Sequence, residues 1–108
     1  MLTNINCKIT VADSYNDLPV TEIGEAVFAF NNDITEVVIS ENVTKIGENA
    51  FNSCRNIEVI TMPSTMEYID ENAIAGCNSL KTIVFNGNAQ DWYDRYLDTL
   101  IPDGVKVD

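Results

Sequence analysis

The hydrophobic positions of this chain repeat with a period of 23 residues. The phrase IGENAFNSC at 46–54 has a close copy, IGEAVFAFN, at 23–31 and a looser copy, IDENAIAGC, at 69–77. Ile23, Ile46 and Ile69 open the three copies, and no insertion separates them. Self-similarity at a fixed period of roughly 20 to 50 residues is typical of stacked supersecondary units. The pattern therefore predicts a solenoid with one coil per copy.

When the copies are set in register, most of the shared positions are apolar. Each coil of a solenoid buries its side chains against the equivalent residues of its neighbours, so these columns are the predicted core. The apolar columns are Ile23/Ile46/Ile69, Phe28/Phe51/Ile74, Ile34/Ile57/Leu80, Val37/Ile60/Ile83, Ile39/Met62/Phe85 and Val43/Met66/Ala89. Two polar columns, Gly24/Gly47/Asp70 and Glu25/Glu48/Glu71, follow the opening isoleucine.

Two kinds of element are predicted in each coil. The segments ITEVVIS, IEVITMP and LKTIVFN are rich in β-branched residues and alternate in polarity, which predicts one short parallel strand per coil. Their inward pairs are Val37/Ile39, Ile60/Met62 and Ile83/Phe85. The ENAF-type segments predict a helical or 3₁₀ turn on the opposite side of each coil.

At the amino-terminal end, the first coil carries an extra loop. Lys8–Val11 is a predicted strand in which Ile9 and Val11 correspond to Ile60 and Met62. The path from this strand to Ile23 is longer by five residues than the equivalent path in a later coil, and the loop contains Tyr15, Asp17 and Pro19.

After residue 87 the repeat stops. An amphipathic stripe predicts a helix that begins at an Asn88 cap, with Asp91 three residues further on. We expect this helix to cover the last coil, and an aromatic helix that docks a partner is the alternative. Pro102-Asp103-Gly104 predicts a turn into a last strand, Val105–Val107. The stripe consists of Ala89, Trp92, Tyr93, Tyr96, Leu97 and Leu100.

The stretch VTKIGENAFNSCRNIEVITMPSTMEYIDENAIAGCNSLKTIVF closely resembles the BspA-like leucine-rich repeat, I-G-x-x-A-F-x-x-C-x-x-L-x-x-I-x-I-P. ITVADSYNDLPVTEIG is similar to that family's usual first repeat, so the resemblance covers about residues 8–87. Asn31, Asp70 and Ile74 depart from the pattern at its cysteine, glycine and phenylalanine positions. The resemblance implies a curved solenoid with a strand-lined concave face, usually in bacterial surface or host-interaction proteins.

Together these observations predict an α/β solenoid: a short right-handed leucine-rich-repeat stack with one parallel strand per coil and a C-terminal amphipathic capping helix. The chain is expected to form a single domain over residues 1–108. Within it we expect an N-terminal coil at 1–22, repeats at 23–45, 46–68 and 69–87, and the capping helix with the last strand at 88–108.

The charge of the chain narrows the classes of partner. With 6 Lys+Arg against 17 Asp+Glu, the formal net charge is −11, which disfavours direct binding to nucleic acid or to anionic membranes and favours basic partners. The first residues, MLTNINCKITVADS, have no secretory signal, and no stretch approaches the ~20 apolar residues of a membrane helix. We therefore expect a cytoplasmic protein if Met1 is the native start, and a cell-surface one if the chain is a fragment.

The residue types argue against an enzyme. The chain has no histidine, so the commonest general base and metal ligand is missing, and with it any Ser-His or Cys-His nucleophile. No phosphate loop, zinc or EF-hand spacing occurs, and we expect no cofactor and no metal. Cys54 and Cys77 share one repeat position, which favours stacked buried thiols over a disulfide or thiolate pair. Glu25, Glu48 and Glu71 predict an exposed column, or else an acidic stripe for a basic partner or a weak divalent cation.

The leading hypothesis is a non-catalytic protein-interaction module that binds its partner through the strand-lined concave face. The alternative is a small acidic inhibitor that mimics nucleic-acid charge to block a basic, nucleic-acid-binding protein, for example a phage protein directed against a host defence. A homodimer through the N-terminal strand edge is a further expectation. The predicted partner-binding residues are Glu36, Val38, Ser40, Val59, Thr61, Thr82, Val84 and Asn86.

Overall fold

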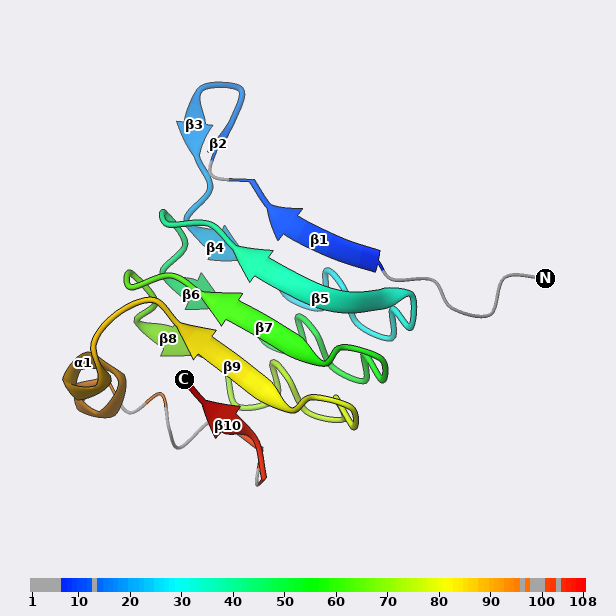
Figure 1. The fold of residues 1–108 in the computed structure, drawn as a ribbon. Helices are drawn as coiled ribbons and strands as arrows, with labels where there is room; N and C mark the ends of the chain where they lie inside the picture. Colours follow the sequence, from blue (N-terminus) through cyan, green and yellow to red (C-terminus); the bar gives the residue numbers. More distant parts are fainter. Residues whose placement is uncertain (1–6, 13, 96, 98–100, 103) are drawn as a thin grey trace.

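Parallel strands from successive coils lie side by side in a five-stranded sheet (Figure 1). The computed structural model describes residues 7–12, 14–95, 97, 101, 102 and 104–108. Within these residues the predicted strand of each coil is present, which confirms a parallel-strand solenoid of about four turns. In sheet order the strands are β1 (Cys7–Val11), β5 (Ile34–Ile39), β7 (Val59–Met62), β9 (Thr82–Phe85) and β10 (Lys106–Val107).

A smaller parallel sheet forms another side of each coil. Its strands start the repeated phrases, and Ile23, Ile46 and Ile69 are directly paired across it. All three side chains are buried, so the column that defines the 23-residue period is a structural column as well. The strands are β4 (Glu22–Ile23), β6 (Lys45–Ile46) and β8 (Tyr68–Ile69).

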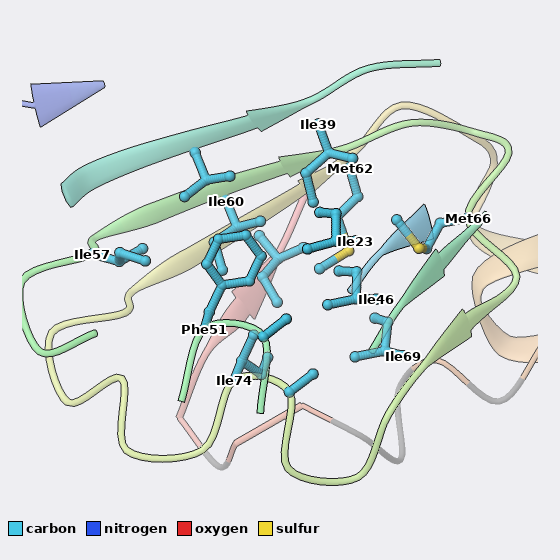
Figure 2. Close-up of a cluster of buried hydrophobic side chains, with 14 of the residues drawn as sticks. Ile23, Ile39, Ile46, Phe51, Ile57, Ile60, Met62, Met66, Ile69 and Ile74 are labelled. Carbon is cyan, nitrogen blue, oxygen red and sulfur yellow. The ribbon is translucent and has the colours of Figure 1, made fainter. Parts of the chain in front are cut away.

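The predicted apolar columns form the core between these sheets (Figure 2). Val37, Ile60 and Ile83 are paired in register and fully buried. The rings of Phe28 and Phe51 stack with centroids 5.2 Å apart and planes 7° apart. One predicted member is wrong. Ala89 is exposed, because the chain leaves the coil after β9 and enters a helix instead of continuing the column.

The predicted helical or 3₁₀ turn is present only as single i→i+3 bonded turns, and no helix forms there. Residues 25–30, 48–53 and 71–76 form series of hydrogen-bonded turns. Ala26 and Asn49 have φ of 55° and 59°, values that interrupt a right-handed helix. The backbone N–H groups of Phe28 and Phe51 donate to the next coil, at Ala50 O and Ala73 O, over 2.8 and 2.7 Å. Inter-coil hydrogen bonds therefore alternate with i→i+3 bonds inside each turn segment, such as Asn52 N–H to Asn49 O over 3.1 Å, and no continuous helix forms.

The extra loop of the first coil is a β-hairpin that extends beyond β1, away from the rest of the stack (Figure 1). Strands β2 (Ser14–Tyr15) and β3 (Leu18–Pro19) pair antiparallel. Asn16 and Asp17 connect them with φ of 52° and 64°, the left-handed pair that a two-residue hairpin turn requires. The predicted insertion is thus present and ordered by its turn residues.

The chain ends in helix α1 (Ala89–Asp94) followed by β10. As predicted, the Asn88 side chain accepts a hydrogen bond from the backbone N–H of Asp91 over 2.8 Å. The helix has only six residues, fewer than the stripe predicted, and Tyr96 and Leu100 lie outside the described residues. Trp92 and Leu97 are buried and Tyr93 is exposed. The last strand of the sheet, β10, pairs with β9. A capping role for the helix and the right-handed winding of the stack both stay predictions.

Candidate functional site

The eight predicted partner-binding residues lie on three adjacent strands and at their carboxyl ends. Strand register places Glu36, Val59 and Thr82 in one row. Val38, Thr61 and Val84 form a second row. These six side chains are half-buried, and their strand neighbours on the opposite face are buried in the core. We call this surface the strand face.

The two remaining predicted residues lie at the carboxyl ends of β5 and β9. The Ser40 hydroxyl donates to the backbone carbonyl of Val11, so it holds β1 against β5. Asn86 is exposed, and its backbone N–H donates to Met62 O over 2.9 Å. Ser40 is half-buried, like the six strand residues, and its hydroxyl is already engaged within the chain.

The edge strands extend the rows with residues that sequence reasoning missed. Lys8 pairs with Glu36, and its Nζ lies 3.8 Å from the Glu36 carboxylate. Thr10 pairs with Val38, and Lys106 pairs with Thr82. The signal was available in the sequence, because Lys8 and Thr10 alternate with the inward residues Ile9 and Val11. The strand face thus has an apolar centre of valines and a lysine at each end.

The strand face alone is narrow. Five strands at about 4.8 Å spacing span ~20 Å. A standard protein interface buries roughly 800 Å² on each partner, a patch of roughly 28 Å on a side. A partner that binds here therefore also contacts the loops that flank the strands.

The glutamate column is exposed, as the simpler of the two interpretations predicted. Glu25, Glu48 and Glu71 all lie on the surface of the turn segments. Among the described residues, no three side chains of the metal-ligating types are grouped closely enough to hold an ion.

The two repeat cysteines are free and buried, and they play one structural role twice. The Cys54 thiol donates to Phe28 O over 3.0 Å, and the Cys77 thiol donates to Phe51 O over 3.1 Å. Burial raises the pKa of Cys54. Burial, and then the proximity of Cys54, raises the pKa of Cys77 to about 11. The disulfide alternative is wrong in this structure, and the stacked-thiol interpretation is confirmed.

A cavity of about 450 Å³ lies between β9, α1 and β10, with Phe85, Trp92 and Ile101 among its lining residues. Its lining residues Ile101, Pro102 and Gly104 are neighbours in sequence of residues 98–100 and 103, which lie outside the described part of the chain. We assign it no ligand. No described helix is long and apolar enough to span a bilayer.

The repeats can now be compared with known proteins. The profile of the family described as "BspA type Leucine rich repeat region (6 copies)" matches residues 4–98. The chain belongs to the BspA-type leucine-rich-repeat family. Proteins of this repeat class commonly mediate protein–protein interaction and are generally non-catalytic.

One solved structure shares the fold of this BspA-type chain. It is the crystal structure of the T. pallidum leucine-rich-repeat protein TpLRR, with a TM-score of 0.70 and 21% sequence identity. The match covers 96% of this chain and 52% of TpLRR, so the chain spans about half the length of that protein. At this identity the likeness establishes the fold alone. A comparison with curated proteins found no match.

Proposed function

We propose that this BspA-type domain is a non-catalytic interaction module that binds a protein partner through the strand face. One observation carries the proposal: the register of β5, β7 and β9 places Val38, Val59 and Val84 on a single half-exposed surface. Valine side chains lose little rotamer freedom on binding, and the hydrogen-bonded sheet holds them in fixed positions. Such a surface is suited to binding without rearrangement.

The charge distribution supports the same face. The chain has a net charge of −11, yet on the strand face Lys8 forms an ion pair with Glu36 and the edge residue Lys106 forms one with Asp108, so this face is close to neutral. Interfaces commonly combine an apolar centre, depleted of charge, with a polar rim. A near-neutral face of this kind favours an apolar contact at its centre, while the rest of the acidic surface favours basic groups on the partner.

The burial of Cys54 and Cys77 supports the non-catalytic part of the proposal. A nucleophilic cysteine acts as the thiolate and sits where its pKa is lowered. Cys54 and Cys77 are buried, and their pKa values are raised. Both thiols stay protonated at neutral pH and serve the packing of the coils.

The test is capture of proteins by the immobilised domain from a lysate of its source organism, followed by mass spectrometry. The variant is Val38→Asp with Val84→Asp, which places two carboxylates in the centre of the strand face. The matched control is Leu18→Asp, an apolar-to-aspartate change at an exposed position of the β2–β3 hairpin, outside this face. Circular dichroism establishes that both variants are folded.

We expect the wild-type domain and Leu18→Asp to capture the same proteins, and we expect the double variant to lose them. Equal capture by a folded double variant would refute the strand face as the binding surface. Washing at high salt separates the second hypothesis from the first. Binding by charge mimicry is lost as the Debye length falls from about 10 Å at 0.1 M to about 3 Å at 1 M, whereas binding centred on valines is retained.

A further inference from the structure

The two ends of the solenoid are covered to different degrees. In the last turn segment Ile74 is buried, whereas its equivalent in the first coil, Phe28, is only half-buried. Likewise Ile83 is fully buried while Ile9, at the same position in the first strand, is half-exposed. Among the described residues, the amino-terminal end is therefore the less covered end, and we call it the open end of the stack.

The first coil also carries larger apolar residues than the coils behind it, at positions where they are exposed. Val27 is 58% exposed, and its equivalents Ala50 and Ala73 are buried. Phe30 is 71% exposed with φ of 62°. The equivalents of Phe30 are Ser53 and Gly76, which share its positive φ.

Folding does not account for Phe30. A large aromatic residue is disfavoured in the left-handed region, and this ring gains little burial in return. Backbone strain of this kind is commonly found at functional sites. The residue choice at Phe30 is consistent with a role in binding.

The backbone of the open end has a defined polarity. Ala26, Phe28 and Phe30 donate their N–H groups to the carbonyls of the next coil. The accepting atoms are Glu48 O, Ala50 O and Asn52 O, at 2.9, 2.8 and 2.8 Å. The equivalent carbonyls of the first coil belong to Glu25, Val27 and Ala29, and no described residue donates to them. The open end therefore presents three acceptors at alternate residues.

The surrounding charge is negative. Glu25 and Asp33 are exposed, and neither takes part in an ion pair among the described residues. A ligand of this end has to supply backbone donors, apolar side chains and positive charge together.

We propose that the amino-terminal end binds an apolar and basic segment of another protein. The segment lies along residues 25–30 in the place of a preceding coil and runs in the same direction. Its N–H groups at alternate residues donate to the carbonyls of Glu25, Val27 and Ala29, and its apolar side chains pack on Phe28 and Phe30. This is main-chain pairing of the kind that joins successive coils, and it is related to strand addition in peptide recognition.

A second copy of this chain fits less well. In a symmetric dimer the two amino-terminal ends would face each other, and carbonyl acceptors would meet carbonyl acceptors with no donor between them. Buried acceptors without donors are destabilising. The polarity of the hydrogen bonds at residues 25–30 thus disfavours a dimer through these turns, whereas a homodimer through the edge of β1 stays a prediction.

The experiment titrates the ¹⁵N-labelled full chain with a seven-residue peptide of alternating lysine and valine, acetylated and amidated at its ends. Three comparison peptides are used: one with glutamate for lysine, one with serine for valine, and one that is N-methylated along its backbone. The protein variant is Val27→Ala with Phe30→Ser, which gives the first coil the residues that the second coil carries at these positions. Because the second coil folds with these residues, the variant is expected to fold.

The proposal predicts amide shift changes concentrated at residues 25–30, with at least tenfold weaker binding by the double variant and by each comparison peptide. The Val38→Asp/Val84→Asp variant should bind the peptide as the wild type does, so failure of the strand-face proposal leaves this result unchanged. No shift changes at millimolar peptide, changes confined to the strand face, or undiminished binding of the N-methylated peptide would each overturn the proposal. A concentration-dependent dimer in analytical ultracentrifugation that Phe30→Ser abolishes would also overturn it, in favour of a second copy.

Discussion

Replacement of Phe30 by asparagine is expected to leave the domain as stable as the wild type, or slightly more stable. Phe30 has φ of 62° and is 71% exposed. For a residue other than glycine or asparagine, the left-handed conformation costs about 1–2 kcal/mol. Asparagine is enriched in this region and already occupies it at Asn49, with φ of 59°. The substitution therefore relieves much of the strain.

The opposing term is the lost burial of the ring. Full burial of a phenylalanine is worth about 1.5–3 kcal/mol, so the less than one-third of Phe30 that is buried contributes under ~1 kcal/mol. The net change in the free energy of unfolding is then between about 0 and +1 kcal/mol. Replacement of a phenylalanine in the core is expected to lower the free energy of unfolding instead. Phe51→Ala is expected to lose about 3–5 kcal/mol, because Phe51 is fully buried and stacks on Phe28.

The assay is equilibrium urea unfolding of the three proteins, followed by far-UV circular dichroism and by the fluorescence of the single tryptophan, Trp92. Coincident transitions establish two-state behaviour, and equal m-values allow the midpoints to be compared. If Phe30→Asn loses more than about 1.5 kcal/mol, Phe30 is packed in solution and both the strain argument and the open end are refuted. A stable variant that also loses peptide binding would separate function from folding at this residue.

Three further predictions concern packing, capping and pH. Gly47→Ala is expected to lose about 1–3 kcal/mol of unfolding free energy, because a Cβ at Gly47 would lie 2.8 Å from the Ile23 carbonyl oxygen. The control is Gly24→Ala, whose Cβ would meet only the Val27 side chain, at 3.3 Å. In urea unfolding the control should lose less stability than Gly47→Ala. Asn88→Ala should lose about 0.5–2 kcal/mol through the missing bond to the Asp91 N–H, and Asn88→Asp, which can still accept it, should lose much less; equal losses would contradict the cap. Folding raises the pKa of Cys77 from 9.0 to about 11, so its contribution to stability is complete below pH 9 and is lost as the pH rises towards 11. Urea midpoints of the wild type should fall more steeply across this window than those of Cys77→Ala, and parallel curves would show that the thiol is not buried in solution.

The sequence by itself determined the repeating part of the fold. In a stack of coils each apolar position is covered by the same position of the next coil, so the spacing of Ile23, Ile46 and Ile69 sets the register as well as the fold class. The same logic predicted that Cys54 and Cys77 would share a role and that Val38, Thr61 and Val84 would form a row. The spacing of apolar residues along the chain therefore predicts how whole coils stack on one another.

Only the tertiary structure decided how the chain behaves where the period is interrupted or the backbone bonds to another coil. Neither alanine nor phenylalanine prefers positive φ, so nothing local predicted the turns at Ala26 and Phe30; the N–H groups of these residues bond to Glu48 and Asn52 in the next coil. Ala89 fits an apolar column by spacing, yet it starts a helix, because the chain leaves the coil after β9. The open amino-terminal end, too, becomes visible only when it is known which coil covers which. The period of buried positions follows from the types of residue along the chain. The partners of the backbone groups, and the faces that stay uncovered, depend instead on contacts between segments far apart in the chain.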